Sequence, residues 1–249
     1  MNSRILHKAL VTITAVLALG LAAWGQCSNA NVTGKYGFEI NGFTKNAQPI
    51  SVAGYLKADG KGTFKGTESA SIGGTIFTNV PITGTYSINA DCTGSAITKV
   101  QKSVNHFNLV VVSGGKSLQT VSADSGNVET EIVQAQGKTT CTLAGLKGSF
   151  GIQSSGMFLT IGSVAFDGVF TLDGKGVVSG KESGSIAGSI FTWLPASGTY
   201  TVASNCTGTM AITVSGQTQH LSFVVTNGGK GMLLVETDAN TVVSGFGQQ

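Results

Sequence analysis

Apolar and polar residues alternate along most of the chain, with a period of two. In the segment HFNLVVV, Phe107, Leu109 and Val111 share one parity, and the segment HLSFVV repeats the pattern with Leu221 and Phe223. A period of two places alternate side chains on opposite faces of a strand. No segment sustains the i, i+3, i+4 spacing of a helix, and glycine interrupts every candidate. The pattern predicts an all-β protein.

The chain is a tandem duplication. The segment ESASIGGTIFT begins at Glu68, and ESGSIAGSIFT begins at Glu182, which is 114 positions later. The same offset relates other matching segments without any insertion, including GTY, CTG and GGK. We therefore predict two similar β domains, at 26–136 and 141–249, which meet at the polar stretch QAQGKTT. Each is of ordinary size for an independent domain.

Short turns rich in Gly, Asn and Asp divide each copy into about eight strands. The segment ADGKG contains Asp-Gly, a strong hairpin signal, and the related GKGTFKG and GKGVVSG are interpreted as turns rather than phosphate loops. Consecutive hairpins favour an up-and-down antiparallel sheet, which eight strands can close into a barrel. Glycines of inward parity fit a tightly coiled sheet. A two-sheet β-sandwich stays open as the alternative.

Residues 1–25 have the pattern of a secretory signal peptide: a basic start, an uncharged apolar run and a small-x-small motif before Gln26. A retained membrane anchor is the rival interpretation, but the apolar run is short for a span. Lipidation of Cys27 is a weaker alternative interpretation of this segment. We expect a secreted protein, periplasmic or extracellular, with no membrane span after cleavage.

Charge is sparse, at 11% of residues, and Arg4 is the only arginine. Without residues 1–25, 13 lysines face 12 acidic residues, so the net charge is about +1. Arginine is the preferred side chain for recognising phosphate. These features argue against nucleic acid and other polyanionic partners.

Each copy holds two cysteines, and their spacing contains no CxxC motif that would suggest zinc or redox chemistry. An oxidising compartment favours disulfides. Of the three possible connectivities, one treats both copies alike within each domain, and this is the one we predict: Cys27–Cys92 and Cys141–Cys206.

Glu68 and Glu182 are the most informative polar residues. On a regular strand their parity aims them inward, where a carboxylate would bind something or carry a raised pKa. Together with Tyr86 and Tyr200 they are the candidate ligand-binding residues. The interpretation we favour is nevertheless that the Gly- and Ser-rich segment bulges, or that Glu lies at the rim, so that both carboxylates behave as exposed groups.

The remaining polar residues suggest little chemistry. His106 and His220 lie opposite the apolar face and are expected to be exposed, without metal or triad companions. Asp124 and Asp238 lie beside a turn, where aspartate favours local hydrogen bonds. No catalytic residue, metal site or cofactor is predicted.

The motifs GKYGFEI, GYLKADGKGTFKGTES and ITGTYSI resemble those of avidin-type and broader calycin-like barrels, which open with a Gly-x-aromatic strand. The chain also resembles uncharacterised secreted bacterial proteins with DGKG and DCTG signatures. The resemblance implies a barrel. It does not imply biotin binding, because that site uses several tryptophans, whereas Trp24 lies in the signal peptide and Trp193 is matched by Asn79.

We expect a secreted, non-catalytic tandem β-barrel protein that binds a small apolar ligand. One alternative is a structural or cell-surface interaction protein whose barrels are packed and hold no ligand. The other is an enzyme using Glu68 and Glu182, which lacks an evident nucleophile and base.

Overall fold

The computed structural model describes residues 26–137 and 141–249. The predicted signal peptide, 1–25, lies outside the described residues. Within the described ranges, no helix is long and apolar enough to cross a membrane.

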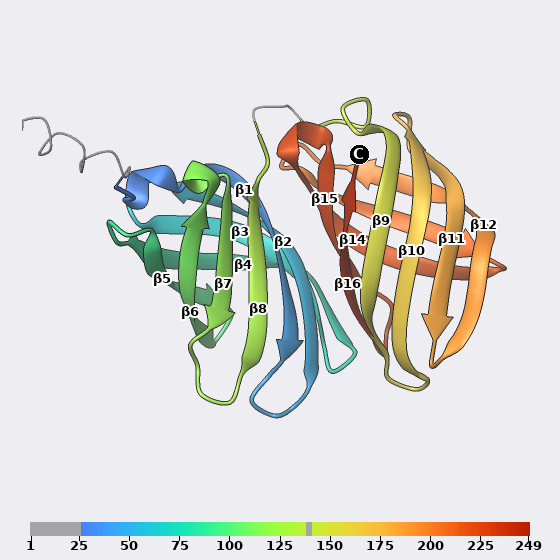
Figure 1. Ribbon diagram of the computed structural model, residues 1–249, viewed down its shortest axis with the longest axis horizontal. Helices are drawn as coiled ribbons and strands as arrows, with labels where there is room; N and C mark the ends of the chain where they lie inside the picture. Colours follow the sequence, from blue (N-terminus) through green and yellow to red (C-terminus); the bar gives the residue numbers. More distant parts are fainter. Residues whose placement is uncertain (1–25, 138–140) are drawn as a thin grey trace, which may run out of the picture.

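Barrel 1 consists of eight antiparallel strands in a closed sheet (Figure 1). The strands are β1 (Thr33–Phe43), β2 (Pro49–Asp59), β3 (Thr63–Ile72), β4 (Thr75–Ile88), β5 (Thr93–Val100), β6 (Ser103–Val112), β7 (Ser117–Ser122) and β8 (Val128–Ala135). Each strand pairs with the next, and β8 pairs with β1. Two short 3-10 helices accompany them, η1 (Asn29–Asn31) and η2 (Ser113–Gly115). The predicted up-and-down barrel is confirmed, and the sandwich is not.

Barrel 2 repeats this architecture. Its strands are β9 (Lys147–Phe158), β10 (Gly162–Asp173), β11 (Val177–Ile186), β12 (Ser189–Val202), β13 (Thr207–Val214), β14 (Gln217–Thr226), β15 (Gly231–Glu236) and β16 (Thr241–Gln248). The helix η3 (Asn227–Gly229) corresponds to η2, and β16 closes the sheet against β9.

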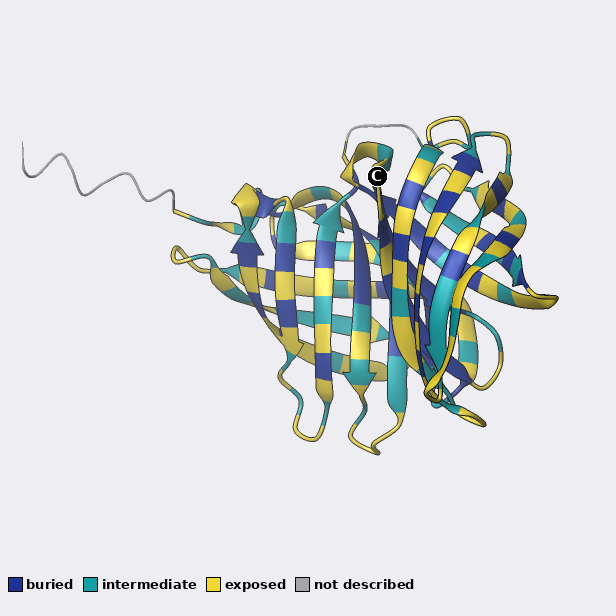
Figure 2. Cartoon of the chain, turned by 45° about the vertical axis from the view of Figure 1, so that its right-hand side comes forward, coloured by how far each residue is buried: buried dark blue, intermediate teal, exposed yellow. Residues whose placement is uncertain are grey.

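Alternation along the strands produces the cores, and Figure 2 shows it as bands of buried and exposed residues. Inward side chains pack into one main apolar cluster per barrel. Glycine is required where a large inward ring crosses a neighbouring strand. A side chain at Gly54 would overlap the ring of Phe38, and one at Gly84 would overlap Phe64. Glycine thus allows aromatic rings to lie flat against the inner wall of a narrow barrel.

One end of each barrel is closed by covalent and hydrogen bonds. Both predicted disulfides are confirmed, Cys27–Cys92 and Cys141–Cys206. Beside the first, the hydroxyl of Tyr86 donates to the carbonyl of Val32 (2.7 Å), and that of Tyr36 donates to Gly115 (2.9 Å). These bonds hold the segment before β1 and the helix η2 over the end of barrel 1.

The Asp-Gly turns form as predicted. The Oδ1 atom of Asp59 accepts hydrogen bonds from the backbone N–H groups of Lys61, Gly62 and Thr63, at 2.8–3.0 Å. These donors lower the pKa of Asp59 to about 2. Asp173 makes the same kind of turn between β10 and β11. The GKG segments therefore serve as hairpin turns.

The two barrels pack side by side through β1–β3 and β14–β16 (Figure 1). Leu233 and Val235 alternate with inward residues of β15 and are nonetheless buried, because they face barrel 1. A side chain at Gly37 would overlap Val224 and Thr226 across this interface. Backbone bonds cross it as well: Asn240 donates to Gly74 (3.0 Å), and Gly228 to Gln136 (2.8 Å).

Candidate functional site in the first barrel

Barrel 1 encloses a cavity of about 650 Å³. All eight strands contribute to its lining, and most of the lining side chains are apolar. They include Phe38, Val52, Leu56, Ile82, Phe107 and Leu109. A cavity of this volume lies within the range typical of small-molecule sites, which are mostly apolar with a few placed polar groups.

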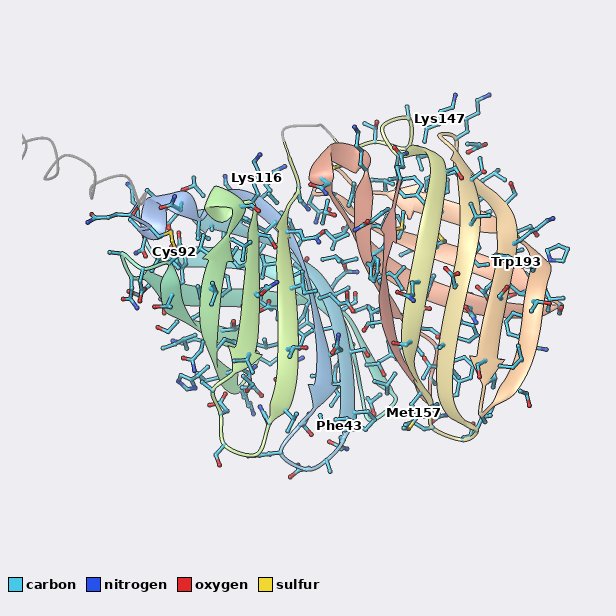
Figure 3. The ribbon with its side chains drawn as sticks, viewed as in Figure 1. Phe43, Cys92, Lys116, Lys147, Met157 and Trp193 are labelled. Carbon is cyan, nitrogen blue, oxygen red and sulfur yellow. A yellow bond between two sulfur atoms is a disulfide. The ribbon has the colours of Figure 1, made fainter. Side chains whose placement is uncertain are left out.

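The cavity extends to the end of the barrel opposite the disulfide. Its lining there comes from the loop between β1 and β2, the start of β6 and the turn between β7 and β8, namely Thr44, Lys45, Gln48, Asn105, Asp124 and Asn127. Figure 3 shows Phe43 at this end of the barrel and Cys92 at the other. We refer to the loop-bearing end as the mouth.

Three carboxyl groups face the cavity. Glu68 lies on β3, and Glu129 and Glu131 lie on the inward parity of β8. The hydroxyl of Thr120, on the neighbouring strand β7, donates to Oε2 of Glu131 (2.8 Å). The polar groups are therefore concentrated on one part of an otherwise apolar wall.

Burial raises the pKa of all three carboxyl groups. Desolvation, followed by the charge of Glu131, raises the pKa of Glu68 to about 7. Desolvation also raises the pKa of Glu131 to about 7, opposed by the Thr120 hydrogen bond and reinforced by Glu129. The pKa of Glu129 is raised by desolvation and then by Asp124. Glu68 and Glu131 therefore exchange protons near neutral pH, whereas ordinary glutamates are fully ionised there.

The equivalent space in barrel 2 is filled. Only about 20 Å³ remains inside it. At matching positions barrel 2 carries larger apolar groups: Met210 for Ala96, Ile212 for Thr98, Leu234 for Thr120 and Phe170 for Leu56. The end that matches the mouth holds an apolar cluster of Val164, Phe166 and Val243, packed against Phe158, Ile186 and Phe191. Barrel 1 has Thr44 in place of Phe158 and Glu129 in place of Val243.

Two carboxyl groups remain in the packed interior of barrel 2. Glu182 and Glu236 are 5% and 2% exposed, and both line the small residual void. Desolvation raises the pKa of Glu182 to about 7; desolvation and then the charges of Asp238 and Glu182 raise that of Glu236 to about 8. Oε1 of Glu182 is buried and has no hydrogen-bond partner among the described residues.

The structure places the four candidate residues inside the barrels, one pair in each. Glu68 and Tyr86 line the cavity of barrel 1. Glu182 and Tyr200 are buried in barrel 2, where the Tyr200 hydroxyl donates to Leu146 (2.9 Å). The two glutamates belong to separate interiors.

Our expectation that these glutamates behave as exposed groups is wrong. A register shift does follow each glutamate, between Glu68 and Ala70 and between Glu182 and Gly184, but the extra residue lies on the neighbouring strand and not in the Gly- and Ser-rich segment where the bulge was predicted. Thr78 and Asn79 of β4 lie opposite the single residue Ser69, and β12 repeats this opposite Ser183. The strand that carries the glutamate therefore keeps its alternation, and the glutamate stays inward.

Sequence reasoning missed Thr120, Glu129 and Glu131. The signal was present in VETEIV, because Glu129 and Glu131 share parity with buried Val133. Charged residues at inward positions of a strand are unusual, and this parity conflict marks them.

His106 and His220 are exposed, as expected, but each has a carboxylate companion. Nδ1 of His106 lies 2.8 Å from Oδ1 of Asp124, whose Oδ2 accepts the backbone N–H of His106 (2.8 Å). His220 and Asp238 repeat this pair. The backbone atoms of both aspartates make local hydrogen bonds, as predicted, but their side chains bond to histidines 18 residues away. Among the described residues no group of three or more His, Cys, Asp or Glu side chains could hold a metal ion.

Comparisons with known proteins leave the chain without an assigned family. No protein-family model matches it, and no curated protein matches it. Among solved structures, the chain is similar to kievitone hydratase from Nectria haematococca, with 9% identity and a TM-score of 0.29, over 92% of this chain and 93% of that one.

Proposed function

We propose that this protein is a non-catalytic binding protein that holds a small, largely apolar ligand inside barrel 1. The observation that carries the proposal is the contrast between two interiors of one fold, about 650 Å³ in barrel 1 and about 20 Å³ in barrel 2. An eight-stranded barrel has an interior that side chains can just fill, or that can hold one small ligand.

Barrel 2 shows that this fold closes well with its interior packed. Barrel 1 departs from that solution at the positions that determine volume, such as Ala96 and Thr98. An empty apolar cavity reduces stability, because its lining groups lose packing partners. A ligand that fills the cavity would restore these contacts, which supports binding over the alternative of a purely structural role.

The proposed setting is outside the cytoplasm, in the periplasm or the extracellular space. Two disulfides suit an oxidising environment, and residues 1–25 resemble a secretory signal peptide. Cell fractionation tests this setting: cells that produce the full chain should export a protein that begins at Gln26.

A binding experiment tests the function. The mature chain should increase the fluorescence of the neutral apolar probe N-phenylnaphthylamine, because the cavity removes the probe from water. The variant Ala96→Met/Thr98→Ile/Thr120→Leu copies the packing of barrel 2 and should lose at least about tenfold in affinity.

Gln119→Leu serves as the control, because Gln119 is the exposed neighbour of Thr120 and should leave binding unchanged. Equal binding by the filled variant and the wild type would place the probe elsewhere. Absence of binding by any form, for this probe and for alkyl ligands alike, would refute the proposed function.

A further inference from the structure

The charged groups facing the cavity of barrel 1 are predominantly acidic. Glu68, Glu129 and Glu131 face it from β3 and β8, and Asp124 lies at the mouth. Lys45, the one lysine among the lining residues, lies in the loop between β1 and β2, where its charge acts on Asp124. Tyr36 and Tyr86 are the other titratable groups, and their hydroxyls donate to backbone carbonyls at the closed end.

The protein itself supplies few hydrogen bonds to these carboxyl groups. Glu129 is 6% exposed and makes no hydrogen bond to any described residue. Glu68 also has none, and Glu131 has only the hydroxyl of Thr120. Buried carboxyl groups are normally hydrogen-bonded or paired with a cation. Here the missing partner would have to come from whatever occupies the cavity.

We propose that the ligand of barrel 1 is a hydrophobic amine, whose ammonium group lies between Glu68, Glu129 and Glu131 and whose apolar body fills the rest of the cavity. The inference rests on the proposed function and specifies the class of its ligand.

Charge separates this ligand class from its competitors. An ammonium group offers N–H donors to the carboxylates and relieves the repulsion among them. A ligand carboxylate would add a further negative charge to the same apolar space. A neutral ligand that only accepts hydrogen bonds would need protonated glutamates as donors.

The sign of the pH dependence distinguishes the cation from the neutral acceptor. The pKa values of Glu68 and Glu131, raised by desolvation to about 7, leave both groups largely protonated at pH 5.5 and largely ionised at pH 8. An alkylamine stays protonated throughout, since an amine of the lysine type has a pKa of about 10. Binding of the amine should therefore strengthen as the pH rises through about 7, whereas binding of a neutral acceptor should weaken.

Three probes with one alkyl chain isolate the head group: dodecylamine, dodecanol and dodecanoate, each below its aggregation concentration. Isothermal titration of the full mature chain at pH 8 should give an affinity for dodecylamine at least about tenfold above that for dodecanol. Dodecanoate should bind more weakly than either. At pH 5.5 the preference for the amine should shrink severalfold.

Glu68→Gln and Glu131→Gln should each lower the affinity for dodecylamine and leave that for dodecanol within about twofold. Glutamine is nearly isosteric and still accepts the Thr120 hydrogen bond, so the fold should survive, which thermal melting checks. Glu182→Gln is the matched control: the same substitution at the equivalent position of the filled barrel should change neither affinity.

The outcomes separate the two proposals. If none of the alkyl probes binds, the proposed cavity function fails and this inference fails with it. If dodecanol binds as tightly as dodecylamine, or if the Gln variants retain full affinity for the amine, the cavity function stands and the amine assignment is overturned. If dodecylamine binds more tightly at pH 5.5 than at pH 8, the amine assignment is overturned in favour of a neutral ligand that accepts hydrogen bonds.

Discussion

Barrel 1 carries Thr98 and Thr120 where barrel 2 carries Ile212 and Leu234, and such exchanges separate a hollow barrel from a filled one. The frame around them is the same in both: eight strands, one disulfide and a tyrosine hydroxyl bonded to the segment before the first strand. The duplication therefore preserved the devices that close the barrel, while the interiors diverged. In this fold, closure and filling are separable properties.

The carboxyl groups sharpen the comparison. Each interior contains the repeated glutamate, but its acidic companion comes from different strands, Glu131 on β8 in one barrel and Glu236 on β15 in the other. The matching positions are Gly245 and Ser122, so duplication alone did not produce the pairs. In barrel 1 the acids face a cavity, and in barrel 2 they face a void too small for a ligand.

The surface of barrel 2 differs as well. Its strand β15 presents Leu233 and Val235 to barrel 1. The facing side of barrel 1 carries small residues such as Gly37, Ala53 and Ser71. The Ser71 hydroxyl donates to the backbone carbonyl of Thr241 across the interface. Large residues on one side and small ones on the other allow two curved sheets to approach closely.

Removing a disulfide should change the stability of the two barrels more than any other substitution considered. Each bridge joins cysteines 65 residues apart and should contribute roughly 4 kcal/mol in the chain-entropy model. Cys27→Ser/Cys92→Ser should unfold barrel 1 at a lower temperature than Cys141→Ser/Cys206→Ser unfolds barrel 2, because barrel 1 has fewer interior contacts. Differential scanning calorimetry of both variants measures this, and the opposite order would contradict the assignment of the weaker interior.

Truncating a matched interior pair should have the next largest effect. Ile212→Ala opens a cavity in packed surroundings and should cost roughly 3 kcal/mol. Thr98→Ala removes atoms that already border empty space, and should cost less than about 1 kcal/mol. Urea denaturation gives both values. Equal losses would mean that the interior of barrel 1 is packed as tightly as that of barrel 2.

The pH dependence of barrel 2 should show the smallest of the three effects. Desolvation raises the pKa of Glu182 from its ordinary value of 4.5 to about 7, so the folded state holds a proton that the unfolded state releases. The contribution of Glu182 to stability should therefore be full below about pH 4.5 and decline as the pH rises to about 7. Glu182→Gln should flatten this decline and be more stable than the wild type at pH 8, on the order of 2 kcal/mol.

Glu68→Gln is the control for that measurement. Its carboxyl group borders the cavity, so water or a ligand can solvate the ionised form in part, and its effect on thermal stability at pH 8 should be the smaller of the two. A larger effect for Glu68→Gln than for Glu182→Gln would reverse the comparison between the hollow and the filled interior.

Local patterns were sufficient to predict much of the fold. The period of two, the Asp-Gly turns and the constant offset led to eight-stranded antiparallel domains, and the positions of Cys27 and Cys92 before odd-numbered strands led to the correct pairing. These features depend on neighbours along the chain, or on ends that a meander brings together. The inward parity of Glu68 was also visible, but the adjacent Gly- and Ser-rich segment led to the wrong choice between inward and exposed.

The sequence by itself determined the all-β architecture, the duplication and the disulfides. Only the tertiary structure decided that barrel 1 is hollow and barrel 2 is filled, because cavity volume depends on how side chains from all eight strands add up across the interior. Both copies show the same alternation along the chain, and the smaller side chains of Ala96 and Thr98 could have been offset in volume by the larger ones of Phe64 and Ile82. The acidic cluster likewise required closure of the sheet, which brings Glu68 of β3 and Glu131 of β8 to the same cavity.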